Sequence, residues 1–160
     1  MLSNTTNVRS YAMTDHSTEV FKILSLFGWS ADRSVDWSAV RQACMQRRFV
    51  VFEEYALVVQ NLYGISIDLI DSEEYCYGAE LIRFDPLVCF TDSLTHARFW
   101  TRLKLLPLAR VDNLAFLYMG NNNTYWYDTM SLSDKFGLEC IGTSLYDALS
   151  WLLFRQAAGH

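Results

Sequence analysis

The spacing of apolar residues changes at Gly64, and this change limits the folds that the chain can adopt. Before Gly64, apolar side chains recur every three or four residues, as they do in amphipathic helices. They predict one helix that ends at Gly28, a second that begins at Asp36, and a third from about Phe52 to Tyr63. After Gly64, apolar and polar residues alternate over residues 65–70, which is typical of a strand with a buried face. The sequence therefore predicts three helices followed by a sheet.

The segment between the first two helices carries its own stop and start signals. Gly28 is expected to end the first helix, because a residue without a Cβ adopts a left-handed conformation at little cost. Asp36 is expected to begin the second by accepting a hydrogen bond from unsatisfied backbone donors. We interpret the segment as a helix-turn-helix hinge with Arg33 between Trp29 and Trp37. Both tryptophans are expected to be buried, and Arg33 to bind a helix end or Asp36 rather than a partner.

The rest of the chain predicts more strands and a closing helix. In chain order, these elements are a strand at Leu81–Asp85, a helix from Asp92 or Ser93 to just before Pro107, strands at Leu105–Val111, Leu114–Met119 and Thr124–Tyr127, and a helix at Ser144–Phe154. Asp112-Asn113 and Gly120–Asn123 are expected to be tight turns, because these residue types tolerate positive φ. The predicted fold is α+β, with an N-terminal three-helix block, a largely antiparallel sheet and a closing C-terminal helix. We expect residues 1–14 to be a flexible N-terminus and residues 15–156 to form a single domain.

Composition narrows the classes of function. The 160 residues carry a formal net charge of −5, which disfavours nucleic-acid binding, because that binding depends on clustered Lys and Arg. An acidic protein suits a basic protein partner instead. We find neither a signal peptide nor an apolar run of roughly 18 residues, so the sequence predicts a cytoplasmic protein with no membrane span.

Catalytic patterns are missing from the sequence. The four cysteines (Cys44, Cys76, Cys89 and Cys140) have no metal-binding or redox spacing, and we expect them to be buried thiols. A cysteine nucleophile would need His16 or His96 close by, and a small cysteine-dependent enzyme remains one alternative. The adjacent pair Glu53-Glu54 is expected to be a solvated helix flank. We therefore predict no enzyme, no metal site and no cofactor.

Six short motifs follow one another along the chain. They are Phe27-Gly28-Trp29, Arg33-Ser34-Val35-Asp36, Leu62-Tyr63-Gly64, Leu106-Pro107-Leu108, Ile141-Gly142-Thr143-Ser144 and Asp147-Ala148-Leu149. This ordered set resembles the third clade of the SUKH superfamily over about Glu19 to Phe154. The chain departs from the family pattern at Ile65, at Ala109-Arg110 and at Asn121–Thr124, where the family often has glycine, Gly-Glu and an Asp/Asn-Gly turn.

The resemblance implies an α+β immunity protein of a bacterial polymorphic toxin system. Such a protein binds and neutralises a cognate toxin domain, often a nuclease, by occlusion. The motif residues would then be structural: Gly28, Trp29, Arg33, Asp36, Gly64, Pro107 and Gly142. The alternative is a SUKH-type regulatory or scaffold module whose partner is no toxin.

Partner contacts are expected from acidic and aromatic residues in the sheet and its first loop. The candidates are Asp68, Asp71, Glu73, Glu74, Tyr75, Tyr77, Asp85, Tyr125 and Tyr127. In a strand, Tyr125 and Tyr127 share one face and Trp126 takes the other, and we expect the tyrosines to be the exposed pair. Solvation alone would also explain the acidic residues.

Overall fold

The computed structural model describes residues 18–75, 78–92, 104–113, 115–128 and 138–155. Its fold is α+β, as predicted. Three helices come first, at residues 18–26, at α2 (Ser38–Gln46) and at α3 (Glu53–Leu62). A six-stranded antiparallel sheet follows, and the last helix is α6 (Leu145–Phe154).

The strands lie in the sheet in the same order as in the sequence, and each pairs antiparallel with the next. Their bounds are β1 (Ser66–Asp68), β2 (Leu81–Arg83), β3 (Leu106–Val111), β4 (Ala115–Met119), β5 (Tyr125–Asp128) and β6 (Leu138–Gly142). A short helix, α4 (Pro86–Asp92), lies between β2 and β3 in the sequence. The sheet is therefore a meander with β1 and β6 as its edges.

The predicted turns have the backbone conformation that their residue types favour. Gly64 follows α3 with φ +91°, and Asp112 and Asn113 join β3 to β4 with φ 53° and 59°. Asn123 has φ 58° in the turn before β5, where the amide of Gly120 donates to the carbonyl of Thr124. Glycine, asparagine and aspartate tolerate the left-handed region better than other residue types, so they allow tight turns at these positions.

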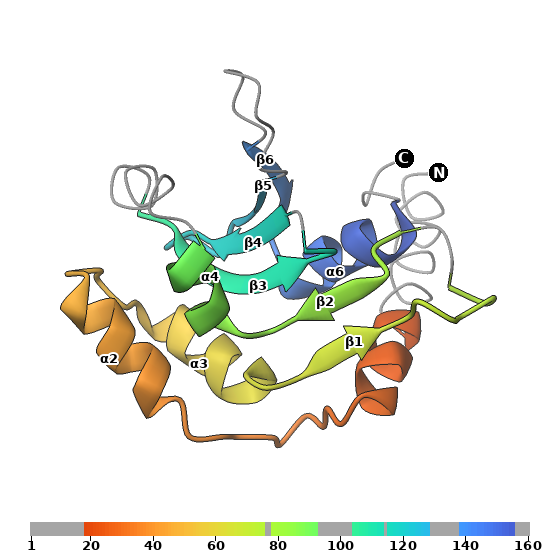
Figure 1. Ribbon diagram of the computed structural model, residues 1–160, viewed down its shortest axis with the longest axis horizontal. Helices are drawn as coiled ribbons and strands as arrows, with labels where there is room; N and C mark the ends of the chain where they lie inside the picture. The colour runs from red at the N-terminus through yellow and green to blue at the C-terminus, as the bar shows by residue number, and fades with distance from the viewer. Residues whose placement is uncertain (1–17, 76–77, 93–103, 114, 129–137, 156–160) are drawn as a thin grey trace, which may run out of the picture.

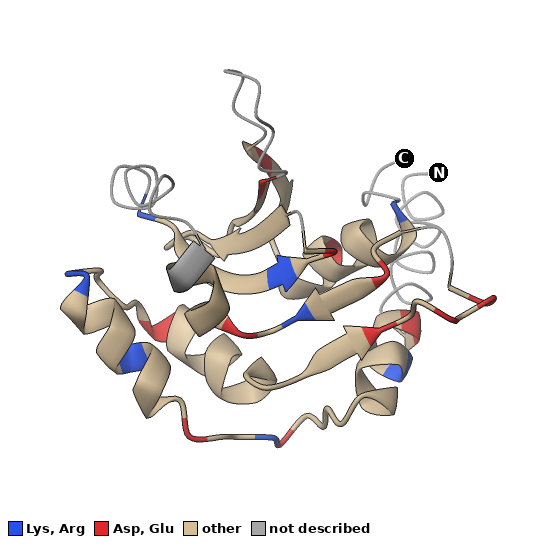
Figure 2. Cartoon of the chain, in the orientation of Figure 1, with Lys and Arg blue, Asp and Glu red and all other residues tan. Residues whose placement is uncertain are grey.

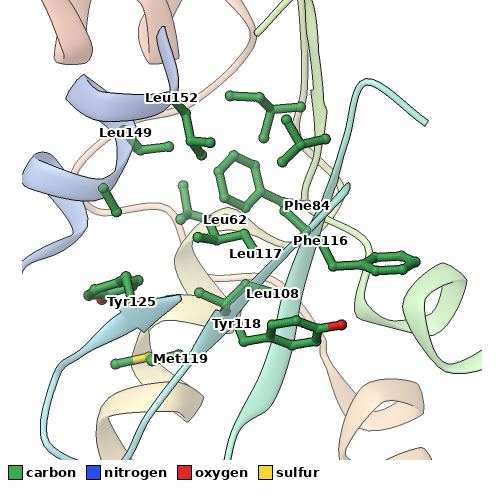
Figure 3. Packing of buried hydrophobic residues seen from close by; sticks show 14 of the residues in the cluster. Leu62, Phe84, Leu108, Phe116, Leu117, Tyr118, Met119, Tyr125, Leu149 and Leu152 are labelled. Carbon is green, nitrogen blue, oxygen red and sulfur yellow. The ribbon is translucent and has the colours of Figure 1, made fainter. Parts of the chain in front are cut away.

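The core lies between the sheet and the helices (Figure 3). All five residues of β4 are buried, as expected for a central strand with both faces covered. Figure 3 shows Leu117 of β4 among Leu62 of α3 and Leu149 and Leu152 of α6. Burying a leucine side chain stabilises the fold by roughly 1.5–3 kcal/mol, so packing onto the sheet stabilises each helix.

The molecule is elongated in Figure 1, and its two ends are built from different elements. The loop between β1 and β2 lies at one end beside the helix of residues 18–26, and α2 lies at the other. α6 packs against β5 and β6, whereas α4 packs against β3 and α2. This separation decides which predicted site residues can act together.

The interpretation of residues 27–37 as a tight hinge is wrong. These residues form an extended connection that runs between the two ends of the molecule (Figure 1). Its local signals are nevertheless as predicted: Gly28 has φ +97°, and the Asp36 carboxylate accepts hydrogen bonds from the Ser38 amide and hydroxyl. Gly28 and Asp36 therefore mark the two helix boundaries. They do not determine the path of the chain between the two helices.

Two elements were not predicted. α4 begins at Pro86, directly after the strand predicted at Leu81–Asp85, and proline is favoured in the first turn of a helix. The edge strand β6 also went unpredicted, because it carries the exposed residues Glu139 and Cys140 and lacks a clear alternation. Most of the helix predicted from Asp92 or Ser93 falls on residues 93–103, which lie outside the described residues. Its predicted end just before Pro107 is wrong, because Leu106 already belongs to β3.

Candidate partner-binding surface

The loop between β1 and β2 presents acidic side chains to solvent. Asp68, Asp71, Glu73 and Glu74 are all exposed, as is Glu80, which was not among the predicted contacts. Figure 2 shows acidic residues along this loop at one end of the molecule. We call the surface formed by these five residues the acidic loop surface.

Hydrogen bonds hold the backbone of this loop in a defined shape. The Ser72 amide donates to the carbonyl of Leu69 over 3.0 Å, which closes a turn, and the Leu69 amide donates to the carbonyl of Glu80 over 2.6 Å. The Tyr75 amide donates to the Ser72 hydroxyl over 3.1 Å. A loop that is already ordered loses less conformational entropy when it binds a partner.

The far side of the loop is docked onto the C-terminal end of α6. The amide of Ala79 donates to the carbonyl oxygen of Leu152 over 2.7 Å. A Cβ at Gly78 would collide with the carbonyl oxygens of Leu152 and Leu153, so only glycine allows this approach. Glycine at position 78 thus joins the loop to the core.

Tyr75 anchors the loop and does not offer its ring to a partner. Its side chain is buried, and its hydroxyl donates to Glu19 Oε2 over 3.1 Å. Burial, followed by the bond to the Glu19 carboxylate, raises the pKa of Tyr75 to about 12. The expected exposed contact at this position is therefore wrong, and the second predicted aromatic, Tyr77, lies outside the described residues.

Asp85 does not belong to the acidic loop surface. It follows the other end of β2, and its carboxylate accepts a hydrogen bond from the Leu87 amide in the first turn of α4 over 3.1 Å. Negative charge at a helix N-terminus is stabilising, so Asp85 has a local structural role. Only four of the five acidic residues predicted to face a partner lie together.

The expected exposure of Tyr125 and Tyr127 is also wrong, because both side chains are buried. β5 lies between β4 and β6, and Trp151 of α6 covers the sheet there, with its ring 5.1 Å from that of Tyr127. Burial raises the pKa of Tyr125 to about 12. The side chains of residues 125–127 alternate between the two faces of β5, as predicted. The faces are reversed, however, because Trp126 is the more exposed residue.

Arg33 has the structural role expected of it, at the C-terminal end of α3. Its guanidinium donates to the carbonyl oxygens of Asn61 and Tyr63 over 2.6 and 2.7 Å. The Asn61 side chain in turn accepts from Trp29 Nε1 and donates to the carbonyl of Arg33. A cation at a helix C-terminus opposes the negative end of its dipole, so these contacts fasten the extended segment to α3.

The other motif residues also occupy structural positions. Trp29 is half-buried and stacks on Phe21 with 5.0 Å between ring centroids, and Trp37 is likewise half-buried rather than buried. The carbonyl of Pro107 accepts a hydrogen bond from the buried Tyr55 hydroxyl over 2.8 Å. A Cβ at Gly142 would lie 2.9 Å from the Ala148 amide nitrogen, which explains glycine just before α6.

The thiols differ in their surroundings. Cys44 and Cys89 are buried, as expected, whereas Cys140 is exposed on β6, which corrects the prediction of a buried thiol there. Burial raises the pKa of Cys44 to about 11, so its nucleophilic thiolate is scarce near neutral pH. His16, Cys76 and His96 lie outside the described residues.

Within the described ranges, no three or more His, Cys, Asp or Glu side chains are grouped so that they could hold a metal ion. None of the helices formed by those residues is long and apolar enough to cross a bilayer. Comparison of the chain with family models, with curated proteins and with solved structures gives no match. The resemblance to the SUKH superfamily therefore rests on the ordered motifs of the sequence.

Proposed function

We propose that this chain is an immunity protein that binds a cognate, basic toxin domain and neutralises it. The family resemblance suggests the class of partner. The structural support for the proposal is the acidic loop surface. The proposed contact consists of Asp68 at the end of β1 and of Asp71, Glu73 and Glu74 in the loop that follows, all of them exposed.

Charge and order together make this surface suitable for a protein partner. Complementary charge accelerates encounter and disfavours wrong partners, whereas a fixed backbone lowers the entropic cost of binding. The hydrogen bonds from the Ser72 and Ala79 amides hold the backbone at these two points of the loop. The interaction would weaken as salt is added, because exposed charges are screened over about 8 Å at physiological ionic strength.

The mechanism that we propose is occlusion. A nuclease toxin needs Lys and Arg side chains to hold the phosphate backbone of its substrate. Carboxylates of the acidic loop surface would pair with those cations and exclude the nucleic acid. We place the protein in the cytoplasm of a bacterium, where such a toxin meets its substrate.

Co-expression with the toxin encoded by the neighbouring gene tests the proposal. Wild-type protein should restore growth, and the double charge reversal Glu73→Lys/Glu74→Lys should not. The matched control is Glu53→Lys/Glu54→Lys, which reverses an adjacent exposed pair at the start of α3. Growth inhibition that persists with the wild-type protein, or equal rescue by both double variants, would contradict the proposal.

A further inference from the structure

A pocket lies near the end of α2, away from the acidic loop surface. It encloses about 270 Å³, and its lining combines aromatic and aliphatic side chains with two cations, Arg48 and Lys104. None of the lining residues is acidic. Val50, which also lines it, is 84% exposed and contributes apolar surface to solvent.

The two cations of this pocket, Arg48 and Lys104, are both exposed. Neither the Arg48 nor the Lys104 side chain contacts a partner among the described residues. Arg47 differs from them, because its guanidinium lies 4.5 Å from the centre of the Phe90 ring and donates to the carbonyl of Ala43. The pocket therefore suits a group that joins an apolar side chain to a carboxylate.

The opposite end of the molecule presents such a group. Ile70 is 56% exposed in the turn that the Leu69–Ser72 hydrogen bond closes. Its amide donates to the Asp68 carboxylate over 3.2 Å, and Asp71 follows it as a second exposed acid. An isoleucine between two aspartates is an unusual residue to expose in a turn, where polar residues dominate.

We propose that copies of this chain associate head to tail, with Ile70 of one copy in the pocket of the next. Asp68 and Asp71 then face Arg48 and Lys104 of the second copy. A cavity of about 270 Å³ has room for one isoleucine side chain. The pocket is thus occupied by Ile70 of a second copy, because the apolar side chain fits the lining and the neighbouring charges are opposite.

The β1–β2 loop and α2 lie at opposite ends of the molecule (Figures 1 and 2). In a head-to-tail assembly, each copy places its loop on one neighbour and receives the loop of another in its pocket. Such a contact is heterologous and produces a ring or an open chain. One side chain and a few charges make a small interface, and we expect weak, salt-sensitive association.

Sedimentation velocity of the wild-type protein gives the first test. At low salt, the mean sedimentation coefficient should rise with concentration up to about 1 mM, where a contact with a Kd of about 0.5 mM is half-formed. Added salt should reverse the rise. A wild-type protein that stays monomeric over this range overturns the proposal.

Two complementary variants test the geometry. Ile70→Ser removes the inserted side chain but keeps the pocket, whereas Arg48→Glu/Lys104→Glu alters the pocket but keeps the turn. Each variant alone should be monomeric, and a 1:1 mixture should give a dimer that grows no further. Leu57→Ser is the matched control, because Leu57 is a comparably exposed apolar residue, 59% exposed on α3, and this variant should assemble like wild type.

Two outcomes of the mixing experiment overturn the proposal: continued assembly of Ile70→Ser alone, or a mixture that remains monomeric. All the substituted side chains are exposed, so circular dichroism should show an unchanged fold for every variant. The experiment uses no toxin. Its result is therefore independent of the proposed immunity function.

Discussion

A single arginine joins two parts of the chain that are distant in sequence. Arg33 donates to the main-chain carbonyls of Asn61, in the last turn of α3, and of Tyr63, which follows the helix. Carbonyls at a helix C-terminus lack a partner within the helix. Because the donor is charged, each bond is stronger than one between neutral groups. The residue type and its neighbouring helix signals predicted this role, but the sequence did not specify which helix end Arg33 would meet.

Replacing Arg33 with alanine should lower the free energy of unfolding by about 2 kcal/mol, since hydrogen bonds to charged groups contribute roughly that much. Urea denaturation followed by tryptophan fluorescence measures the change. Arg41→Ala is the control, because Arg41 is exposed on α2 and its loss should change stability by at most about 0.5 kcal/mol. Equal effects of the two substitutions would contradict the structural role of Arg33.

Tyr75 should make stability depend on alkaline pH. Its pKa is about 12 in the folded protein, against about 10 in an unfolded chain. Above pH 10 the unfolded state therefore holds fewer protons, and the stability contributed by Tyr75 below pH 10 is lost as pH rises towards 12. Tyr75→Phe should make the fall in stability between pH 10 and 12 shallower, as measured by urea denaturation at each pH. An unchanged slope would mean that the Tyr75 hydroxyl titrates normally.

At the level of elements, the β1–β2 loop is docked onto α6 just before Glu80. This docking depends on contact between the Gly78 region and the last turn of α6, far along the sequence. The sequence predicted a loop at these residues, but the pattern in the loop does not specify the helix that it meets. The docking is therefore a tertiary property.

Gly78→Ala should separate the loop from α6, because its Cβ would meet two carbonyl oxygens. We expect a loss of about 1–3 kcal/mol in stability, typical of overpacking, and faster hydrogen exchange at the Ala79 amide. Gly28→Ala is the control: at φ +97° it strains the backbone, but no atom lies within 4 Å of the new Cβ, so Ala79 exchange should be unchanged. Unaltered Ala79 exchange in Gly78→Ala would contradict the docking.

The elements differ in how well local sequence predicted them. α3 and α6 carry full apolar stripes, and the Ser144 hydroxyl accepts from the Asp147 amide as a helix cap should. Pro86 was ambiguous because proline suits both a strand end and the first turn of a helix. The exposed residues of β6 gave no strand pattern, since this edge strand buries few of its side chains.

For the whole molecule, the distance between its two ends explains which residues of the candidate site could be predicted from the sequence and which could not. Asp68, Asp71, Glu73 and Glu74 are neighbours in sequence, so their clustering was predictable. Asp85 is also close in sequence, but β2 carries it away from the loop to the start of α4. The burial of Tyr125 and Tyr127 depends on which helix covers β5, which alternation along one strand does not specify.

The most direct test of the acidic loop surface is the affinity of the cognate toxin domain for matched charge reversals, measured by isothermal titration calorimetry. We expect Glu73→Lys/Glu74→Lys to raise the Kd at least about 10-fold, a loss of about 1.4 kcal/mol in binding free energy. Glu53→Lys/Glu54→Lys makes the same change in net charge at the start of α3. It should raise the Kd less than about 2-fold, because salt screens charges that lie far from the contact. Equal losses in the two variants, or no loss in the first, would contradict the claim that the β1–β2 loop is the contact.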